Sequence, residues 1–284
     1  PARIAEAFAL LRLFGFKIHA HFMANLLGAT PAADKRDYRR LVADPAFLPD
    51  EVKLYPCALV DGTGLMAHYR DGSWRSYTEE ELLDVLVEDA AATPPYTRIS
   101  RMIRDISSHD IVAGNKKVNL RQLVERRAEE AGVRFEEIRT REIGTDGADV
   151  DTLALSVVAY ETAVASERFL QWTAPDGRIA AFLRLSLPFP SCVDDLRERF
   201  ADFPIGPSEA MIREVHVYGA VAGLHRTSAG AQHLGLGKRL IEAATDIARE
   251  AGCEALNVIS AVGTREYYRG LGFQDKGMYQ RKTL

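Results

Sequence analysis

The six residues Gln232-His233-Leu234-Gly235-Leu236-Gly237 decide the fold of the C-terminal half of this chain. They follow a strand that we predict at 212–218 and precede a predicted amphipathic helix that ends at Gly252. Glycines let successive backbone N–H groups converge, and the helix adds the positive end of its dipole. The pattern Gln-x-x-Gly-x-Gly therefore predicts a site for an anion such as a pyrophosphate. A tight strand-to-helix turn, which would need the same glycines, is the structural alternative.

The segments around this glycine loop are rich in predicted strands. We predict strands at 155–160, 168–173, 179–185, 255–261 and 278–282, a hairpin turn at 175–177 and a short helix at 265–271. This order of elements resembles the GNAT acetyltransferase superfamily. The resemblance implies that the strand before the loop offers backbone groups to the pantetheine arm of acetyl-CoA and that the loop holds the pyrophosphate.

The first hundred residues alternate predicted helix and strand. A helix at 4–13 precedes a strand at 16–23, a helix at 31–41 precedes a strand at 52–60, and a third helix begins with a capping box at Thr78 and Glu81. Such alternation implies parallel strands joined by right-handed crossovers. Two strands are too few to close a sheet, so we expect this segment to be the C-terminal part of a larger α/β unit.

A narrower resemblance covers nearly the whole chain. The stretches 213–219, 232–237 and 258–269 resemble the catalytic subunit of Elongator, as do 52–56, 62–65, 94–98, 104–106, 114–117 and 119–121. That family joins a radical-SAM barrel to a GNAT domain and modifies carbon 5 of the wobble uridine of tRNA with acetyl-CoA. The resemblance implies an α/β fold: the C-terminal part of a radical-SAM-type barrel, then a GNAT domain with a mixed, mostly antiparallel sheet.

The resemblance also implies that the chain divides into three regions and that the family's cluster-binding cysteines are missing from it. Residues 1–93 would be the C-terminal part of the barrel, 94–147 a basic linker region and 148–284 the GNAT domain. The family's cysteine trio for a [4Fe–4S] cluster has no counterpart, because Cys57, Cys192 and Cys253 lie far apart. We therefore expect S-adenosylmethionine and [4Fe–4S] in the full-length family member. We do not expect this chain alone to bind them, and we expect no metal site in it.

The resemblance assigns an acetyl-CoA site to residues on both sides of the glycine loop. The cofactor-binding candidates are Glu214, Val215, His216, Val217, Gln232, Gly235, Leu236, Gly237, Lys238 and Tyr268. Tyr268, near the thioester, and Glu214 are the catalytic candidates. Neighbours on a helix point about 100° apart, so only one of Tyr267 and Tyr268 can face the cofactor. A structural carboxylate remains the alternative for Glu214, and transfer to carbon disfavours His216 as a general base.

A basic stretch lies between Pro94 and Arg121, although the net charge of the chain is −4. Its cations are Arg98, Arg101, Arg104, Lys116, Lys117 and Arg121. Clustered cations bind RNA phosphates, and with the resemblance they imply contact with the anticodon stem-loop of tRNA. An ordinary solvated surface is the alternative. His19 and His21, on one face of a predicted strand, are more typical of core or rim histidines than of metal ligands.

The bulk properties restrict the class of protein. The 284 residues, 47% of them hydrophobic and 27% charged, are typical of a globular protein. We find neither a secretory signal nor a run of roughly 18 apolar residues, so we expect no membrane association. Scattered cysteines favour a cytoplasmic location.

Together these features predict an acetyl-CoA-dependent, tRNA-modifying acyltransferase that acts on the wobble uridine and hydrolyses acetyl-CoA when tRNA binds. Without its iron–sulfur motif, the chain would be incomplete for radical chemistry. One alternative is a protein lysine or small-amine N-acetyltransferase of the GNAT superfamily. Another is a non-catalytic fragment that binds acetyl-CoA or tRNA. Membership of a larger complex and self-association stay open.

Overall fold

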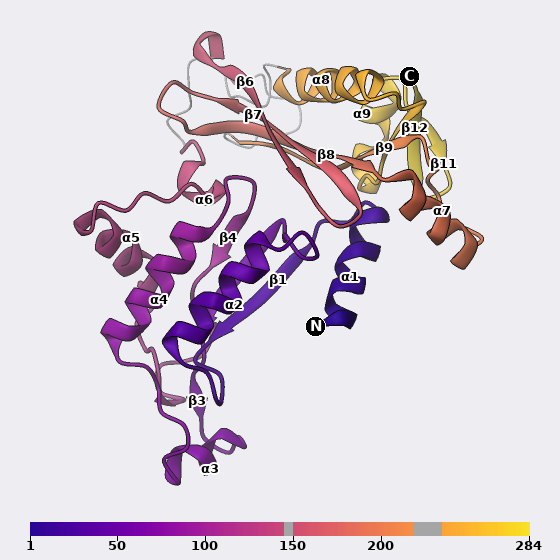
Figure 1. Cartoon of the computed structure of the whole chain (residues 1–284). Helices are drawn as coiled ribbons and strands as arrows, with labels where there is room; N and C mark the ends of the chain where they lie inside the picture. Colours follow the sequence, from indigo (N-terminus) through magenta and orange to yellow (C-terminus); the bar gives the residue numbers. More distant parts are fainter. Residues whose placement is uncertain (145–149, 219–234) are drawn as a thin grey trace. The chain divides into compact units, whose positions relative to one another are not determined.

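A computed structural model describes residues 1–144, 150–218 and 235–284 of the chain (Figure 1). The chain forms two compact units. The first unit consists of residues 1–18, 45–47 and 141–284, and the second consists of residues 19–44 and 48–140. Both units combine helices with β-sheet, which confirms the predicted α/β class.

The second unit is built on a parallel sheet in the order β1-β2-β4. β1 spans His19–Ala24, β2 Glu51–Pro56 and β4 Arg98–Arg101. Because side chains alternate along a strand, Val52, Leu54 and Ile99 share one face, and all three are fully buried. They pack with side chains of three helices, α2 (Pro31–Ala43), α4 (Glu79–Ala92) and α5 (Leu120–Glu130).

Local signals explain the ends of several elements in this unit. The Thr78 side chain accepts from the Glu81 N–H while the Glu81 side chain accepts from the Thr78 N–H, so the predicted capping box is confirmed. The strand predicted at 52–60 ends at Pro56, which has no N–H to donate to a sheet. The chain then forms β3 (Leu59–Val60), which pairs with β5 (Ile111–Ala113); α3 is Leu65–Arg70 and α6 is Ile138–Arg141.

The first unit contains a seven-stranded sheet in the order β11-β12-β10-β9-β8-β7-β6. The strands are β6 (Ala154–Glu161), β7 (Ala165–Thr173), β8 (Ile179–Pro188), β9 (Glu209–Val217), β10 (Ala255–Val258), β11 (Gln274–Lys276) and β12 (Tyr279–Thr283). Only β9 and β10 are parallel, and the other neighbours are antiparallel. The mixed, mostly antiparallel sheet is therefore confirmed.

Helices complete the first unit. α8 (Leu236–Glu250) buries Leu240, Ile241 and Ala244 in the main apolar core of the unit, as its predicted apolar face requires. The remaining elements are α7 (Pro190–Arg199), α9 (Arg265–Gly270) and the short 3-10 helices η1 (Val150–Thr152) and η3 (Val262–Thr264).

The N-terminal helix α1 (Ala2–Leu13) belongs to the first unit. Leu13 packs with Val193 and Met211, and the Phe14 carbonyl accepts a 2.8 Å hydrogen bond from the Tyr279 hydroxyl. Gly15, with φ +82°, approaches Met211 so closely that a Cβ there would lie 2.9 Å from the sulfur. Residues 1–18 thus pack with 141–284, and the three-part division that the resemblance implies stays a prediction.

Within the residues that the structure describes, none of the helices is both long and apolar enough to cross a membrane.

A buried acid in α4 makes the stability of the second unit depend on pH. Asp89 is 1% exposed, and neither carboxyl oxygen has a hydrogen-bond partner among the described residues. Burial, with a smaller effect of Asp34, raises the pKa of Asp89 to about 8. The ordinary pKa of aspartate is about 4, so the folded state holds the proton more tightly than the unfolded state. Stability should therefore fall as the pH rises from 4 through 8.

We predict that Asp89→Asn removes the fall in stability of the second unit at high pH. The variant should resemble the parent protein at pH 5 and exceed it at pH 9 by on the order of 2–4 kcal/mol in free energy of unfolding. Urea unfolding followed by Trp74 fluorescence, in a Trp172→Phe background, measures the second unit alone. Asp84→Asn, at an exposed position of the same helix, is the control. A difference between Asp89→Asn and the parent that does not change with pH would contradict the prediction.

Candidate functional site

β9 carries four of the predicted cofactor residues, and a β-bulge lies at their start. Glu214 lies opposite Arg184 of β8, whereas Ile212 lies opposite Leu185, so Arg213 is an extra residue in β9. Bulges of this kind redirect side chains and are common beside active sites. Here the bulge lets the consecutive residues Arg213 and Glu214 both reach partners on the same sheet face.

Glu214 is held by two cations. Its Oε2 accepts from Arg184 Nε at 2.8 Å, and its Oε1 lies 2.9 Å from Lys17 Nζ. The Arg184 guanidinium is buried and lies over the Phe169 and Phe182 rings, 5.1 and 5.4 Å from their centroids. Burial alone would raise the pKa of Glu214, but the Arg184 and Lys17 charges outweigh it and hold that pKa below its ordinary value. Glu214 is therefore an ionised, hydrogen-bonded carboxylate.

The residues after Glu214 alternate between the two faces of the sheet. Val215 and Val217 pack against the apolar core that contains α8. His216 stacks on Phe182, with ring centroids 5.6 Å apart, and lies 4.3 Å from the ring centroid of Tyr218. This is the alternation that the sequence predicts for a strand.

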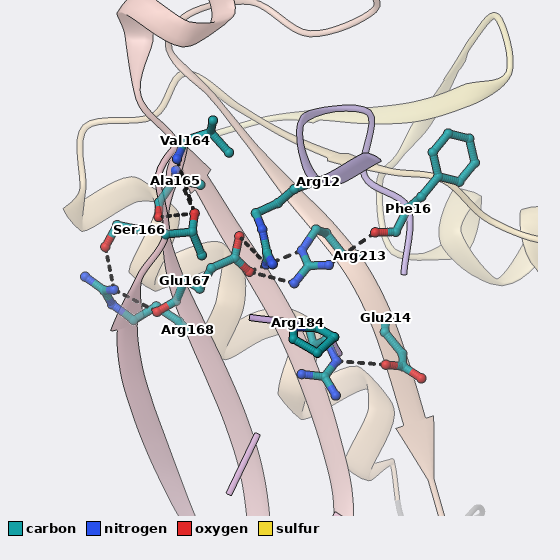
Figure 2. A network of polar contacts seen from close by, with 12 residues as sticks. Arg12, Phe16, Val164, Ala165, Ser166, Glu167, Arg168, Arg184, Arg213 and Glu214 are labelled. Atoms are coloured by element: carbon teal, nitrogen blue, oxygen red, sulfur yellow. Dashed lines mark hydrogen bonds and ion pairs between the residues drawn. The ribbon is translucent and has the colours of Figure 1, made fainter. Parts of the chain in front are cut away.

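A fully buried ion cluster lies next to Glu214 on the same face (Figure 2). Arg213 donates two hydrogen bonds to Glu167 Oε2, at 3.1 and 2.9 Å, and Arg12 Nη1 lies 3.6 Å from Glu167 Oε1. Main-chain carbonyls accept from the same guanidinium groups: Phe47 O from Arg12 at 3.1 Å, and Phe16 O from Arg213 at 3.2 Å. The three charged residues are at most 5% exposed.

Sequence reasoning did not identify this cluster. Arg12, Glu167 and Arg213 lie in three different elements, and a lone charge inside an apolar run does not reveal its partner. The one available signal was that Arg12 interrupts the apolar face of a predicted amphipathic helix.

The pairing of β9 with β10 ends beside the first turn of α8. Their pairing ends where Ile212 lies opposite Val258, whereas β9 continues to Val217. The β9 backbone beyond Ile212 therefore has an edge that β10 does not cover. A Cβ placed on Gly237 of α8 would lie 3.5 Å from Val217 Cγ2 and 3.3 Å from the Tyr267 hydroxyl. The end of β9, the start of α8 and α9 therefore meet at Gly237.

The two adjacent tyrosines of α9 differ in exposure. Tyr268 is 7% exposed and packs against Phe273, whereas Tyr267 is 45% exposed. Burial raises the pKa of Tyr268 to about 12, so its hydroxyl keeps its proton at neutral pH. Among the described residues this hydroxyl has no hydrogen-bond partner. The catalytic candidate Tyr268 is thus the largely buried tyrosine, whereas Tyr267 is the one that lies beside Gly237.

The remaining cofactor candidates lie at or before the start of α8. Gln232 lies outside the described residues. Gly235 caps α8 with φ +70°, a conformation that favours glycine, and Leu236 is fully buried. Lys238 is 59% exposed and pairs with Glu242 at 3.7 Å.

The six predicted RNA-binding cations all lie in the second unit, in different surroundings. Arg121 is mostly buried and donates to the Ile99 carbonyl and to Glu137. Arg101 pairs with Asp105, Lys117 pairs with Glu79, and the Arg104 guanidinium lies over the Tyr55 ring. Lys116 is exposed, and Arg98 is half-buried in β4.

A hollow of about 480 Å³ lies beside these cations. Its lining includes Arg101, Arg121, Arg139 and Gln122, at the end of β4 and the start of α5.

The ranges that the structure describes contain no group of three His, Cys, Asp or Glu side chains able to hold a metal ion. His19 and His21 lie 5.3 Å apart, ring to ring, and His19 Nε2 is 3.6 Å from a Glu51 carboxyl oxygen.

Comparisons with known proteins agree with the two-part resemblance. The Radical_SAM C-terminal domain model matches residues 49–130, and the Acetyltransferase (GNAT) family model matches residues 157–273. The tRNA uridine(34) acetyltransferase of Dehalococcoides mccartyi is 35% identical over 99% of this chain and 61% of its own length. Elongator complex protein 3 of Homo sapiens is 34% identical over 99% of this chain and 51% of its own length.

A solved structure agrees as well. The archaeal Methanocaldococcus infernus Elp3 with an N-terminal deletion superposes with a TM-score of 0.87 at 33% identity, covering 99% of this chain and 66% of that chain. The chain therefore spans about half to two thirds of the length of these relatives.

We predict that Glu167→Gln destabilises the first unit by about 3–5 kcal/mol, because it removes the carboxylate charge that pairs with two buried guanidinium groups. Urea unfolding followed by Trp172 fluorescence, in a Trp74→Phe background, measures this change. Glu161→Gln, at an exposed position of β6, should change the free energy of unfolding by less than about 1 kcal/mol. A loss below about 1 kcal/mol for Glu167→Gln would show that the cluster does not stabilise the unit.

Proposed function

This chain belongs to the Elongator catalytic-subunit family, and from that premise we propose that it is an acetyl-CoA-dependent enzyme that modifies the wobble uridine of tRNA. Its first unit would bind acetyl-CoA and its second unit would bind tRNA, at the anticodon stem-loop. A cytoplasmic location and transfer of the acetyl group to carbon 5 of uridine belong to the same proposal.

The observation that carries the proposal is the parting of β9 from β10 beside Gly237. An uncovered strand edge offers backbone groups to the amides of a pantetheine arm. The first turn of α8 offers backbone N–H groups and the positive end of the helix dipole to a pyrophosphate. Because Gly237 has no side chain, a ligand can approach the backbone between Val217 and Tyr267.

Two features of the site favour transfer to carbon over transfer to an amine. An N-acetyltransferase needs a group that takes a proton from the amine. Glu214 would have to leave the Arg184 and Lys17 cations to do so. A protonated tyrosine hydroxyl, in contrast, suits hydrogen bonding to a thioester carbonyl or a departing thiolate, and Tyr268 would have this role.

The basic residues divide into surface and structural groups. Arg101, Arg104, Lys116 and Lys117 are exposed enough to contact RNA phosphates. Arg121 hydrogen-bonds to main-chain and buried acceptors, so we expect its loss to destabilise the fold as well as RNA binding. The hollow next to this group would lie beside the bound RNA.

The residues present do not fit the iron–sulfur cluster of the full-length family. Cys57 lies between β2 and β3 in the second unit, whereas Cys192 lies in α7 and Cys253 between α8 and β10 in the first. Burial raises the pKa of Cys57 and Cys253, which disfavours the thiolate that ligation needs. We therefore assign no step of the reaction to a cluster held by this chain.

We predict that Gly237→Val weakens acetyl-CoA binding at least about tenfold, because the new side chain occupies the space between Val217 and Tyr267. Calorimetric titration measures the affinity, and thermal unfolding checks that the fold is retained. Gly144→Val is the matched control, since no atom lies within 4 Å of a Cβ there. Equal affinity in Gly237→Val and the parent protein would place the acetyl-CoA elsewhere.

The proposed function itself is tested by hydrolysis. We predict that this protein hydrolyses acetyl-CoA faster when unmodified tRNA is added, because tRNA is the proposed acceptor of the acetyl group. Release of free CoA, followed with a thiol reagent, measures the rate. A hydrolysis rate that tRNA does not change, together with acetylated lysines in mass spectra, would favour the N-acetyltransferase. Binding without hydrolysis under any condition would favour the non-catalytic alternative.

A further inference from the structure

The chain crosses between its two units four times, after Ile18, Asp44, Phe47 and Thr140. Three short segments of the first unit adjoin these crossings: residues 14–18, residues 45–47 and residues 141–143. Residues 14–18 and 45–47 hydrogen-bond within the first unit to β9 or to the buried ion cluster beside it, and residues 141–143 hydrogen-bond to Tyr218, just beyond the end of β9.

The segment before the first crossing holds the bulge of β9. The Phe16 carbonyl accepts from Arg213, and Lys17 lies 2.9 Å from Glu214, so two consecutive residues of the segment contact two consecutive residues of the strand. The next residue but one, His19, begins β1 of the second unit. Nothing but Ile18 separates the Lys17 contact from that strand.

The segment 45–47 contacts the ion cluster. Arg12 donates to the Phe47 carbonyl at 3.1 Å and lies 3.6 Å from Glu167, which in turn accepts both hydrogen bonds from Arg213. The Pro45 carbonyl accepts from the Ala163 N–H, just before β7. A change at this segment thus reaches β9 through two buried side chains.

The segment after the last crossing contacts Tyr218, the residue just beyond the end of β9. The Tyr218 hydroxyl donates to Glu142 at 3.0 Å, and the N–H of Tyr218 donates to Ala180. Arg141 donates to Gln171 of β7 at 3.1 Å, and Ile143 hydrogen-bonds to Ile179 of β8. The strand is therefore contacted at its bulge and just beyond its end by segments that continue directly into the second unit.

We propose that this network, the β9 relay (Arg12, Lys17, Glu142, Glu167, Arg213, Glu214 and Tyr218), couples RNA binding by the second unit to the acetyl-CoA site of the first. The inference rests on the proposed function, because it takes β9 as the cofactor strand and the second unit as the RNA-binding unit. Within the relay Lys17 is a positioning residue, which acts on the cofactor strand through Glu214.

The physical properties of the relay suit such coupling. Coupling needs a contiguous set of contacts whose arrangement both sites can bias. Separating the buried ions costs several kcal/mol, so Arg12, Glu167 and Arg213 should move together rather than apart. Lys17, 36% exposed, is the relay member next to the first crossing, two residues before His19 of the second unit. The β9 edge that would respond is the one left uncovered by β10, where no hydrogen bonds from β10 oppose a shift.

The experiment measures the affinity of the protein for acetyl-CoA with and without saturating unmodified tRNA. The ratio of the two dissociation constants is the coupling factor, and we expect it to be at least about fivefold in the parent protein. In Lys17→Met the ratio should fall toward one, and in Lys17→Arg, which keeps the charge, it should recover. Lys276→Met removes another partly exposed lysine that pairs with a glutamate of β9, and it should keep the parent ratio.

Tyr218→Phe tests the relay independently of Lys17. It removes only the hydroxyl that donates to Glu142, and it should lower the ratio even if Lys17→Met fails to fold. A parent ratio of one, or an unchanged ratio in both Lys17→Met and Tyr218→Phe, would overturn the relay. Absence of acetyl-CoA binding in the parent protein would instead overturn the proposed function. If the protein binds both acetyl-CoA and tRNA but the coupling factor is one, the result contradicts the relay and agrees with the proposed function.

Discussion

One buried carboxylate, Glu167, determines how β9 is held. It is fully buried between two guanidinium groups, those of Arg12 and Arg213, and these in turn donate to the carbonyls of Phe47 and Phe16. Burial of charge is unfavourable unless the charges are paired and hydrogen-bonded. Four hydrogen bonds and the Arg12–Glu167 ion pair join these five groups, so that α1, β7 and β9 are held together.

The properties of the candidate site follow from that arrangement. Because Arg213 is committed to Glu167, the bulge leaves Glu214 to Arg184 and Lys17, and Glu214 is an ionised structural carboxylate. The opposite face of β9 remains apolar and packs on α8, and the edge of β9 that β10 does not cover lies beside Gly237. The ion pairs of Glu214 and the β9 edge that β10 does not cover thus lie in the same stretch of β9, beyond Ile212.

Local patterns predicted much of the fold but not the long-range contacts. The α8 face, the capping box at Thr78 and the strand alternation after Glu214 depend on neighbours in sequence, so spacing alone was enough. β4 has four residues, two of them arginines, which is too short and too polar for a strand pattern. The contact of Lys17 with Glu214 joins residues nearly 200 positions apart, and neither residue carries a sign of the other. Sequence analysis therefore predicted a candidate site on β9 and α8 but not the network that holds β9.

The account is tested most directly by hydrogen–deuterium exchange across β9. If β9 is the cofactor strand and is coupled to the second unit, a peptide covering residues 211–218 should exchange more slowly when acetyl-CoA is added. The same peptide should change again when tRNA is added, although the predicted RNA-binding residues lie in the other unit. Exchange in this peptide that neither ligand alters would contradict the account.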